Sequence, residues 1–265
     1  MADLFSNALA YEGAMGRWSA RLAPLFATFA HVTDGGRVLD VGCGTGSLVK
    51  ALADMTHRTE ITGIDPVRPF VEYCRARFAD PRIAFDCGDA LNLPYPAGVF
   101  DHTLSLLVLM FIPEPEKAAS EMRRVTRPGG TVAAATWDSR GGFVWMRMFW
   151  DTAAMIDPEA GARRAKTFAR PIALPGGLER VWKTAGLTDV VQDMLTIRMD
   201  FSSFGDFWAP MEGKDGPFAD YVRTLTPEAK AILRDKLRLA YVDGEADGTR
   251  SYAATAWAVR GKVPV

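Results

Sequence analysis

The stretch RVLDVGCGTGSLVK, residues 37–50, joins an apolar run to three glycines in five positions. The apolar run predicts a buried β-strand over Arg37–Val41, and the residues after the glycines predict a helix. Gly42, Gly44 and Gly46 therefore fall on the turn between the two elements. Because glycine has no Cβ and the start of a helix presents unpaired N–H groups, this turn is a candidate contact surface for a ligand. The glycines can also serve only the turn itself, and that alternative stays open.

The spacing of the glycines argues against two common nucleotide-binding loops. A dinucleotide loop has its third glycine one position later, where this chain has Ser47, and a phosphate loop ends in Gly-Lys-Ser/Thr. Acidic residues follow the strands instead: Asp40 ends the first strand, Asp65 lies nineteen residues after Gly46, and Asp89 follows the third strand. An acid at the end of the second strand accepts hydrogen bonds from ribose hydroxyls in such folds. This set predicts a ligand with a ribose, an amino group and at most one anionic group, which S-adenosylmethionine matches better than NAD.

Strand and helix patterns alternate through the first half of the chain, which is typical of a parallel sheet flanked by helices. Two more strand-like runs, residues 188–201 and 250–261, come late in the chain and are separated by a polar and aromatic excursion. Ligands of open α/β sheets bind outside the carboxyl ends of the strands, so the excursion is expected above one end of the sheet. The earlier predicted strands are Arg37–Val41, Glu60–Ile64, Arg82–Asp86, Phe100–Leu106 and Thr131–Thr136, and the predicted helices are Ser47–Met55, Arg68–Ala79 and Glu116–Val125.

Length and charge limit the possible classes of protein. A chain of 265 residues is near the upper size of one hydrophobic core, so we expect one elaborated domain. Lys and Arg number 31 against 32 Asp and Glu, without a long block of either sign, which predicts no nucleic-acid partner. The three cysteines lack the spacing of a metal or thiol-redox site, so we expect no metal and a reducing cytoplasmic location. No secretory signal is expected, and the longest apolar run, residues 104–112, is too short to span a membrane.

Four segments, in order over residues 35–137, resemble motifs of the class I S-adenosylmethionine-dependent methyltransferases. They are VLDVGCGTG, ITGIDP, GDALNLPYPAGVFD and EMRRVTRPGG, and they are most similar to the ubiquinone/menaquinone-biosynthesis C-methyltransferase branch. The resemblance implies an α/β, Rossmann-like fold: a seven-stranded, mostly parallel sheet with an antiparallel last strand and helical lid insertions. It also implies a single methyltransferase domain, 1–265, with an N-terminal helical cover (1–34), a cofactor-binding core (35–137) and substrate-side lid insertions (138–186 and 202–248).

The resemblance further implies which residues contact the cofactor, S-adenosylmethionine. The glycines line its methionine portion, Asp65 takes the ribose hydroxyls, and the other contacts come from the strand ends and a leading helix. Asp40 joins this set because a carboxylate beside the loop suits an ammonium group or orients the loop. For Tyr11 and Arg17, which belong to the leading helix, the alternative is that this helix merely covers the sheet. The full set is Tyr11, Arg17, Asp40, Gly42, Gly44, Gly46, Asp65, Pro66, Asp89, Ala90 and Leu106.

The implied activity is in-line methyl transfer to a small, partly apolar organic acceptor. Met110 and Phe111 stand where many relatives carry a histidine pair, and His31, His57 and His102 lie away from the expected site, so no base is assigned. The chain lacks the Asn/Asp-Pro-Pro-aromatic and Pro-Cys motifs of nucleic-acid methylation. Aromatic and methionine clusters at 143–150 and 201–218 are candidate pocket walls, although they could equally fill the core.

Two other classes of function stay open. The βα pattern and the position of Asp65 suit a nicotinamide-dependent oxidoreductase, against which Ser47 argues. The lack of an evident base suits a non-catalytic module that binds S-adenosylmethionine. The sequence does not determine the identity of the acceptor, the methylated atom or the oligomeric state. A homodimer stays one of the alternatives.

Overall fold

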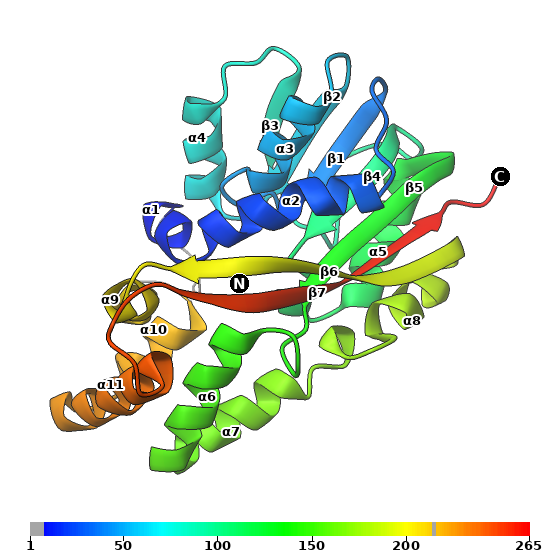
Figure 1. The fold of residues 1–265 in the computed structure, drawn as a ribbon. Coiled ribbons are helices and arrows are strands. Elements are labelled where there is room, and N and C mark those ends of the chain that lie inside the picture. Colours follow the sequence, from blue (N-terminus) through cyan, green and yellow to red (C-terminus); the bar gives the residue numbers. More distant parts are fainter. Residues whose placement is uncertain (1–7, 214–215) are drawn as a thin grey trace.

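The computed structural model describes residues 8–213 and 216–265 and is built on one seven-stranded sheet with the order β3-β2-β1-β4-β5-β7-β6 (Figure 1). Strands β1 to β5 are parallel, and β7 runs antiparallel to both of its neighbours, β5 and β6. This confirms the predicted sheet with its antiparallel last strand. The strands are β1 (Arg37–Val41), β2 (Glu60–Asp65), β3 (Ile83–Cys87), β4 (Phe100–Leu106), β5 (Thr126–Trp137), β6 (Thr188–Phe201) and β7 (Arg250–Lys262).

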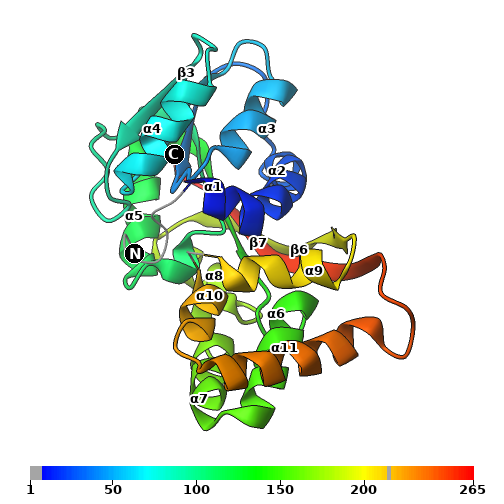
Figure 2. The same ribbon diagram turned by 90° about the vertical axis from the view of Figure 1, so that its left-hand side faces the viewer.

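Helices cover both faces of the sheet. Helices α2 (Arg17–Phe29) and α3 (Ser47–Met55) pack against each other on one face, and α5 (Pro115–Val125) lies on the other face (Figure 2). Helix α8 (Gly177–Thr184) packs against α5 and against strands β6 and β7. No helix within the described ranges combines the length and the apolar character that a membrane span requires.

Most predicted element boundaries differ from the observed ones by one or two residues, as end effects allow. Helix α4 runs over Arg68–Arg77, and β3 begins one residue later than predicted. The largest correction concerns residues 127–130, RPGG, which lie between the predicted helix Glu116–Val125 and the predicted strand Thr131–Thr136. They belong to β5, because Thr126 already pairs with Phe100 and the strand continues through a register shift.

The long connection between β6 and β7 lies at the carboxyl edge of the parallel strands. Because β6 and β5 both run antiparallel to β7, β6 ends and β7 begins at that edge. The connection holds α9 (Phe204–Trp208), a 3-10 turn (Ala209–Glu212), α10 (Pro217–Val222) and α11 (Pro227–Val242). The Thr226 hydroxyl caps α11 by accepting the N–H of Ala229.

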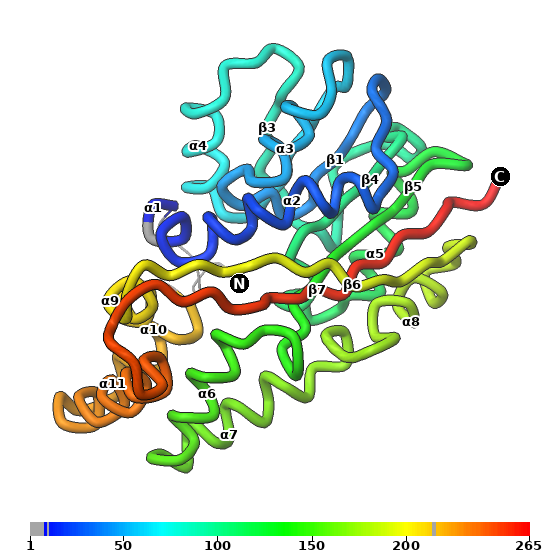
Figure 3. Tube along the Cα trace, in the orientation of Figure 1, coloured from blue at the N-terminus to red at the C-terminus, as the bar shows by residue number. Residues whose placement is uncertain are grey.

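A second helical segment, α6 (Val144–Ile156) and α7 (Pro158–Phe168), lies at the same end of the molecule (Figure 3). Aromatic contacts join it to the β6–β7 connection: the Trp145 ring lies 5.7 Å from Phe201 and 5.0 Å from Phe218. Phe201 also contacts Trp18 of α2, at 5.3 Å between ring centres. The helices above the sheet edge therefore share one continuous apolar core with the sheet.

One continuous run of helix precedes the first strand of the sheet. It consists of α1 (Ala8–Tyr11), a π-helical turn (Glu12–Gly16) and α2, without an interruption of helical structure. A π-turn inside an α-helix often marks a functional site. Here the turn places Tyr11 and Met15 at the carboxyl edge of the sheet, where they line a cavity.

Candidate functional site

The glycine loop is fixed to the end of β2 by backbone hydrogen bonds. The N–H groups of Gly42 and Cys43 donate to the carbonyl oxygen of Ile64, at 2.7 and 3.0 Å. All three loop glycines have positive φ, between 52° and 88°, which explains their number in this turn. A Cβ on Gly42 would lie 2.5 Å from the Val108 methyls, whereas a Cβ on Gly44 would meet nothing within 4 Å. The loop is therefore packed at Gly42 and open beside Gly44.

Asp65 is a structural partner of this loop. Its Oδ2 accepts the N–H of Gly44 and its Oδ1 accepts the N–H of Val67, both at 2.9 Å. Burial raises the pKa of the Asp65 carboxyl, although these two hydrogen bonds act in the opposite direction. The side chain is 7% exposed, so the geometry shows how Asp65 holds the loop. Its contact with a ribose stays a prediction.

Asp40 is a buried acid without a protein partner on one of its oxygens. It is 1% exposed, and no described group forms a hydrogen bond with its Oδ1. Burial, and then the charge of Asp65, raise the pKa of Asp40 to about 8. Together with Gly42, Ser19 and Tyr11, Asp40 lines a small cavity of about 40 Å³. A cationic group placed in this cavity would satisfy the free carboxyl oxygen and favour its ionised form.

The two predicted residues of the leading helix lie in different environments. Tyr11 lines the small cavity and also a larger one, its ring lies 5.6 Å from that of Phe70, and burial raises its pKa. Arg17 lines neither cavity. Its Nη1 donates to Asp206 at 2.9 Å and its guanidinium lies 4.3 Å from the Trp18 ring centre, so it joins the leading helix to α9.

The remaining predicted residues lie around the ends of β2, β3 and β4. Pro66 and Asp89 are exposed and Ala90 is buried, and the N–H of Gly88 donates to the Asp65 carbonyl at 3.2 Å, which brings the end of β3 beside that of β2. The Asp89 carboxylate accepts the N–H of Leu91. Leu106 lines the small cavity. The structure thus gathers the predicted strand-end residues at one edge, and their contacts with a cofactor stay predictions.

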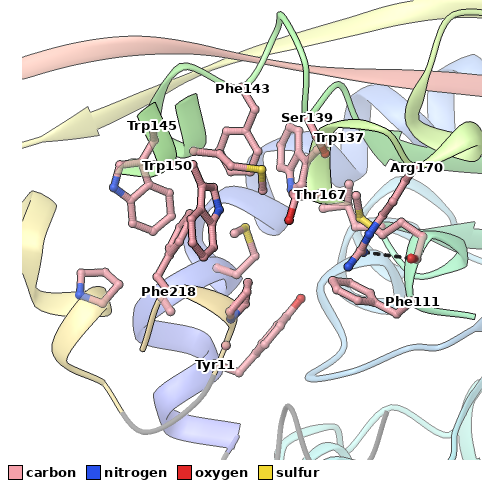
Figure 4. A pocket seen from close by; sticks show the side chains of 18 residues that line it. Tyr11, Phe111, Trp137, Ser139, Phe143, Trp145, Trp150, Thr167, Arg170 and Phe218 are labelled. Carbon is pink, nitrogen blue, oxygen red and sulfur yellow. Dashed lines mark hydrogen bonds between the residues drawn. The ribbon is translucent and has the colours of Figure 1, made fainter. Parts of the chain in front are cut away.

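A larger cavity of about 120 Å³ lies beside the small one (Figure 4). Its walls are mainly aromatic and methionine side chains, which include Phe143, Trp145, Trp150 and Phe218. This confirms part of the predicted pocket walls. Other members of the same two clusters fill the core, which was the alternative; they include Phe204, Phe207 and Trp208. Met110 and Phe111, which replace the histidine pair of many relatives, also line this cavity.

Leu107, which no sequence signal marked, lies where the two cavities meet. It follows β4, its N–H donates to the Ala135 carbonyl at 2.8 Å, and its φ is 65°. A leucine in this left-handed region costs roughly 1–2 kcal/mol. Leu106 and Val108 line the small cavity, whereas Leu107 lines the large one. The unusual backbone at Leu107 therefore lets three consecutive residues contribute to two different cavities. Backbone strain of this kind clusters at functional sites.

The three histidines lie toward the opposite edge of the sheet. His31 follows α2 and approaches Arg260, the N–H of His57 donates to Asp34, and His102 is near the start of β4. Burial lowers the pKa of His102 to about 4. None lines either cavity, and within the described residues no group of three metal-binding side chains is present.

Comparison with known proteins agrees with this geometry. Residues 39–134 match the family model of a methyltransferase domain. Methyltransferase GfsG of Streptomyces halstedii is 37% identical over 114 residues, which are 42% of this chain and 41% of that protein. Phosphatidylethanolamine N-methyltransferase of Cereibacter sphaeroides is 36% identical over 127 residues, 46% of this chain and 60% of that protein. The chain thus spans about half the length of these curated relatives.

Among solved structures, the fold is similar to phosphoethanolamine N-methyltransferase 2 of Haemonchus contortus, in complex with phosphomonomethylethanolamine and S-adenosylhomocysteine. The TM-score is 0.60 at 17% identity, over 97% of this chain and 57% of that one. At this identity the likeness concerns the fold alone.

The fold is the Rossmann-like class I fold of S-adenosylmethionine-dependent methyltransferases, and residues 39–134 within it match the model of a methyltransferase domain. The closer resemblance to the ubiquinone/menaquinone branch stays a prediction.

Proposed function

We propose that this chain transfers a methyl group from S-adenosylmethionine to a small, partly apolar organic acceptor. The observation that carries the proposal is the pair of adjoining cavities that share Tyr11. One lies beside the glycine loop and a buried acid, and the other is walled by aromatic side chains. A donor site and an acceptor site that adjoin in this way are what direct group transfer requires.

The residues around the small cavity fit the cofactor. The free oxygen of Asp40 suits its ammonium group, and the open space beside Gly44 suits close approach to backbone. We expect Asp65, Pro66, Asp89 and Ala90, at the neighbouring strand ends, to contact the adenosine. When bound, S-adenosylmethionine supplies a methyl group that its sulfonium has already activated. We infer that the segment that carries Tyr11, which lines this cavity of about 40 Å³, moves outward when the cofactor binds.

The protein contributes to the reaction by positioning the acceptor against the methyl group and by excluding water. In-line displacement needs the acceptor atom held behind the methyl carbon, and positioning alone can supply roughly 7–11 kcal/mol in favourable systems. The described lining of the large cavity contains no Asp, Glu or His. The acceptor atom must therefore already be nucleophilic when it binds, because no carboxylate or imidazole in that described lining is present to deprotonate it.

The alternative of a module that binds S-adenosylmethionine without turnover is not favoured, because residues 39–134 match the model of a methyltransferase domain. The nicotinamide alternative is not favoured, because Ser47 replaces the third glycine and residues 39–134 match a methyltransferase domain. A homodimer and a cytoplasmic location stay predictions, and sedimentation of the purified chain would test the former.

The proposal is tested by calorimetry followed by a transfer assay. S-adenosylhomocysteine should bind to the purified chain, and more tightly than NADH. Label from methyl-tritiated S-adenosylmethionine should then pass to members of a panel of small aromatic acids, phenols and amines. Failure to bind S-adenosylhomocysteine would remove the proposal. Binding without transfer to any compound would favour the non-catalytic module.

A further inference from the structure

The described wall of the large cavity contains one cation, Arg170, without an acidic partner. Arg170 precedes the 3-10 turn Pro171–Ala173, and its Nη1 donates to the carbonyl oxygen of Met110 at 3.1 Å (Figure 4). Its guanidinium carbon lies 5.8 Å from the Phe111 ring centre. Among the described residues no carboxylate forms an ion pair with Arg170, and burial lowers the pKa of its guanidinium. A partly buried cation with only a neutral partner is costly unless an anion joins it.

The other polar groups of the wall point to the same kind of ligand. The indole N–H groups of Trp137 and Trp150 and the hydroxyl of Ser139 are buried, and no described protein group forms a hydrogen bond with them. An indole N–H can only donate a hydrogen bond. Leaving such a group unpaired costs about 1–3 kcal/mol. These donors and Arg170 surround a space to which the described lining contributes no carboxylate.

The volume limits the size of the ligand. A cavity of about 120 Å³ is close to the roughly 150 Å³ of an engineered apolar cavity that binds benzene. Aromatic rings on several sides favour stacked or edge-to-face contact with a flat apolar body. Figure 4 shows Arg170 and Trp150 on opposite sides of this space, with Tyr11 below it. A ligand held at Arg170 therefore extends across the cavity past Tyr11, the residue shared with the small cavity.

Resting on the proposed function, we propose that the methyl acceptor is a ring-sized apolar molecule that carries one anionic oxygen group, and that Arg170 binds this group. The buried donors of Trp137, Trp150 and Ser139 accommodate further oxygen atoms of the same molecule. Arg170 is thus a specificity-determining residue: it selects anionic over neutral acceptors and fixes which end of the acceptor faces away from the guanidinium.

The test compares two probes of nearly equal shape, benzoate and benzamide, by calorimetry in the presence of saturating S-adenosylhomocysteine. We expect benzoate to bind at least about tenfold more tightly, which corresponds to about 1.4 kcal/mol. Arg170→Gln, which keeps a donor for the Met110 carbonyl but no charge, should abolish this preference. Arg170→Lys should keep part of it. Arg163→Gln is the matched control, because Arg163 lies on the neighbouring α7, pairs with Glu159 and does not line the cavity.

Equal binding of the two probes, binding of neither, or a preference that survives Arg170→Gln would overturn the inference. The affinity of each variant for S-adenosylhomocysteine shows whether the variant is folded. If Arg170→Gln does not fold, the decision rests on the wild-type probe pair and on Arg170→Lys, which must weaken the preference for benzoate. Binding of S-adenosylhomocysteine without a preference for benzoate would remove this inference and leave the proposed function standing. Failure to bind S-adenosylhomocysteine would remove the proposed function instead.

Discussion

At the scale of single residues, the site depends on buried polar groups whose partners are incomplete. Asp40 keeps one oxygen without a hydrogen bond from any described protein group and lies near the charge of Asp65. The chain retains an acid at a place where a neutral side chain would be less costly to bury. This is the pattern of a group kept for binding, since perturbed acids cluster at functional sites.

The raised pKa of Asp40 predicts a pH-dependent stability of the ligand-free chain. With a pKa of about 8 when folded and 3.8 as the ordinary value, the folded chain holds a proton that the unfolded chain has lost. The native state is therefore penalised as pH rises from about 4 to about 8, by at most about 1.4 kcal/mol per pH unit. Asp40→Asn should become more stable than wild type toward pH 8, as measured by urea unfolding at several pH values. If the free energy of unfolding changes with pH in the same way for the two proteins, Asp40 does not hold this proton.

Tyr11 is expected to act mainly through its ring. Tyr11→Phe keeps the contact with Phe70 and the cover over both cavities, whereas Tyr11→Ala opens them. We expect the alanine variant to bind S-adenosylhomocysteine about tenfold or more weakly, a loss of about 1.4 kcal/mol, and the phenylalanine variant to stay near wild type. Calorimetry measures both. If phenylalanine is as damaging as alanine, the hydroxyl carries the contact instead.

At the scale of elements, helix α8 is positioned by a close backbone contact with the turn that precedes it. The first residue of α8, Gly177, packs directly on the preceding 3-10 turn. A Cβ at Gly177 would lie 2.1 Å from the carbonyl oxygen of Pro171. This turn directly follows Arg170, so the contact also helps to fix the polar wall of the large cavity.

Gly177→Ala should therefore destabilise the chain strongly. Overpacking of this kind typically costs about 1–3 kcal/mol, and the backbone atoms of Pro171 and Ile172 leave little room to adjust. Gly161→Ala is the control: Gly161 lies inside α7, its Cβ would meet only Ala154 at 4.0 Å, and the change should stabilise by up to about 1 kcal/mol. Thermal unfolding of the two variants gives the comparison. A Gly177 variant as stable as wild type would contradict this account of α8.

At the scale of the whole molecule, one sheet edge collects segments from the entire chain. The leading helix, the loops after β1, β2 and β4, the α6–α7 segment and the β6–β7 connection all meet there (Figures 1 and 2). The leading helix carries Tyr11, which lines both cavities, so we expect this helix to close over the bound cofactor. Segments that move in this way are expected to have low local stability in the free protein.

Hydrogen exchange should detect this closure. Added S-adenosylhomocysteine is expected to slow amide exchange in residues 8–29 and in the glycine loop. Residues at the opposite edge of the sheet, such as the loop from Thr56 to Thr59, should change little and serve as an internal control. Uniform slowing of exchange throughout the chain would indicate global stabilisation by binding, without closure of the leading helix.

The sequence by itself determined the sheet and the position of the acids that follow its strands. Strand patterns, the positive-φ glycines and the acids at strand ends are local features, because each depends on residues close together in the chain. The carboxyl ends of parallel strands meet at one edge, so the strand pattern alone places Asp40, Asp65 and Asp89 together. RPGG was misplaced because pairing across to Phe100 extended β5 through it.

Only the tertiary structure decided the larger cavity. Arg170 reaches the carbonyl of Met110 from sixty positions away, and Tyr11 meets cavity walls formed by residues 107–218. The sequence around Arg170 carries no signal of this role, and Leu107 is one leucine in an apolar run. Local patterns report which face of an element is buried; which distant side chains enclose a cavity depends on how the helices pack above the sheet, and that packing is a property of the whole fold.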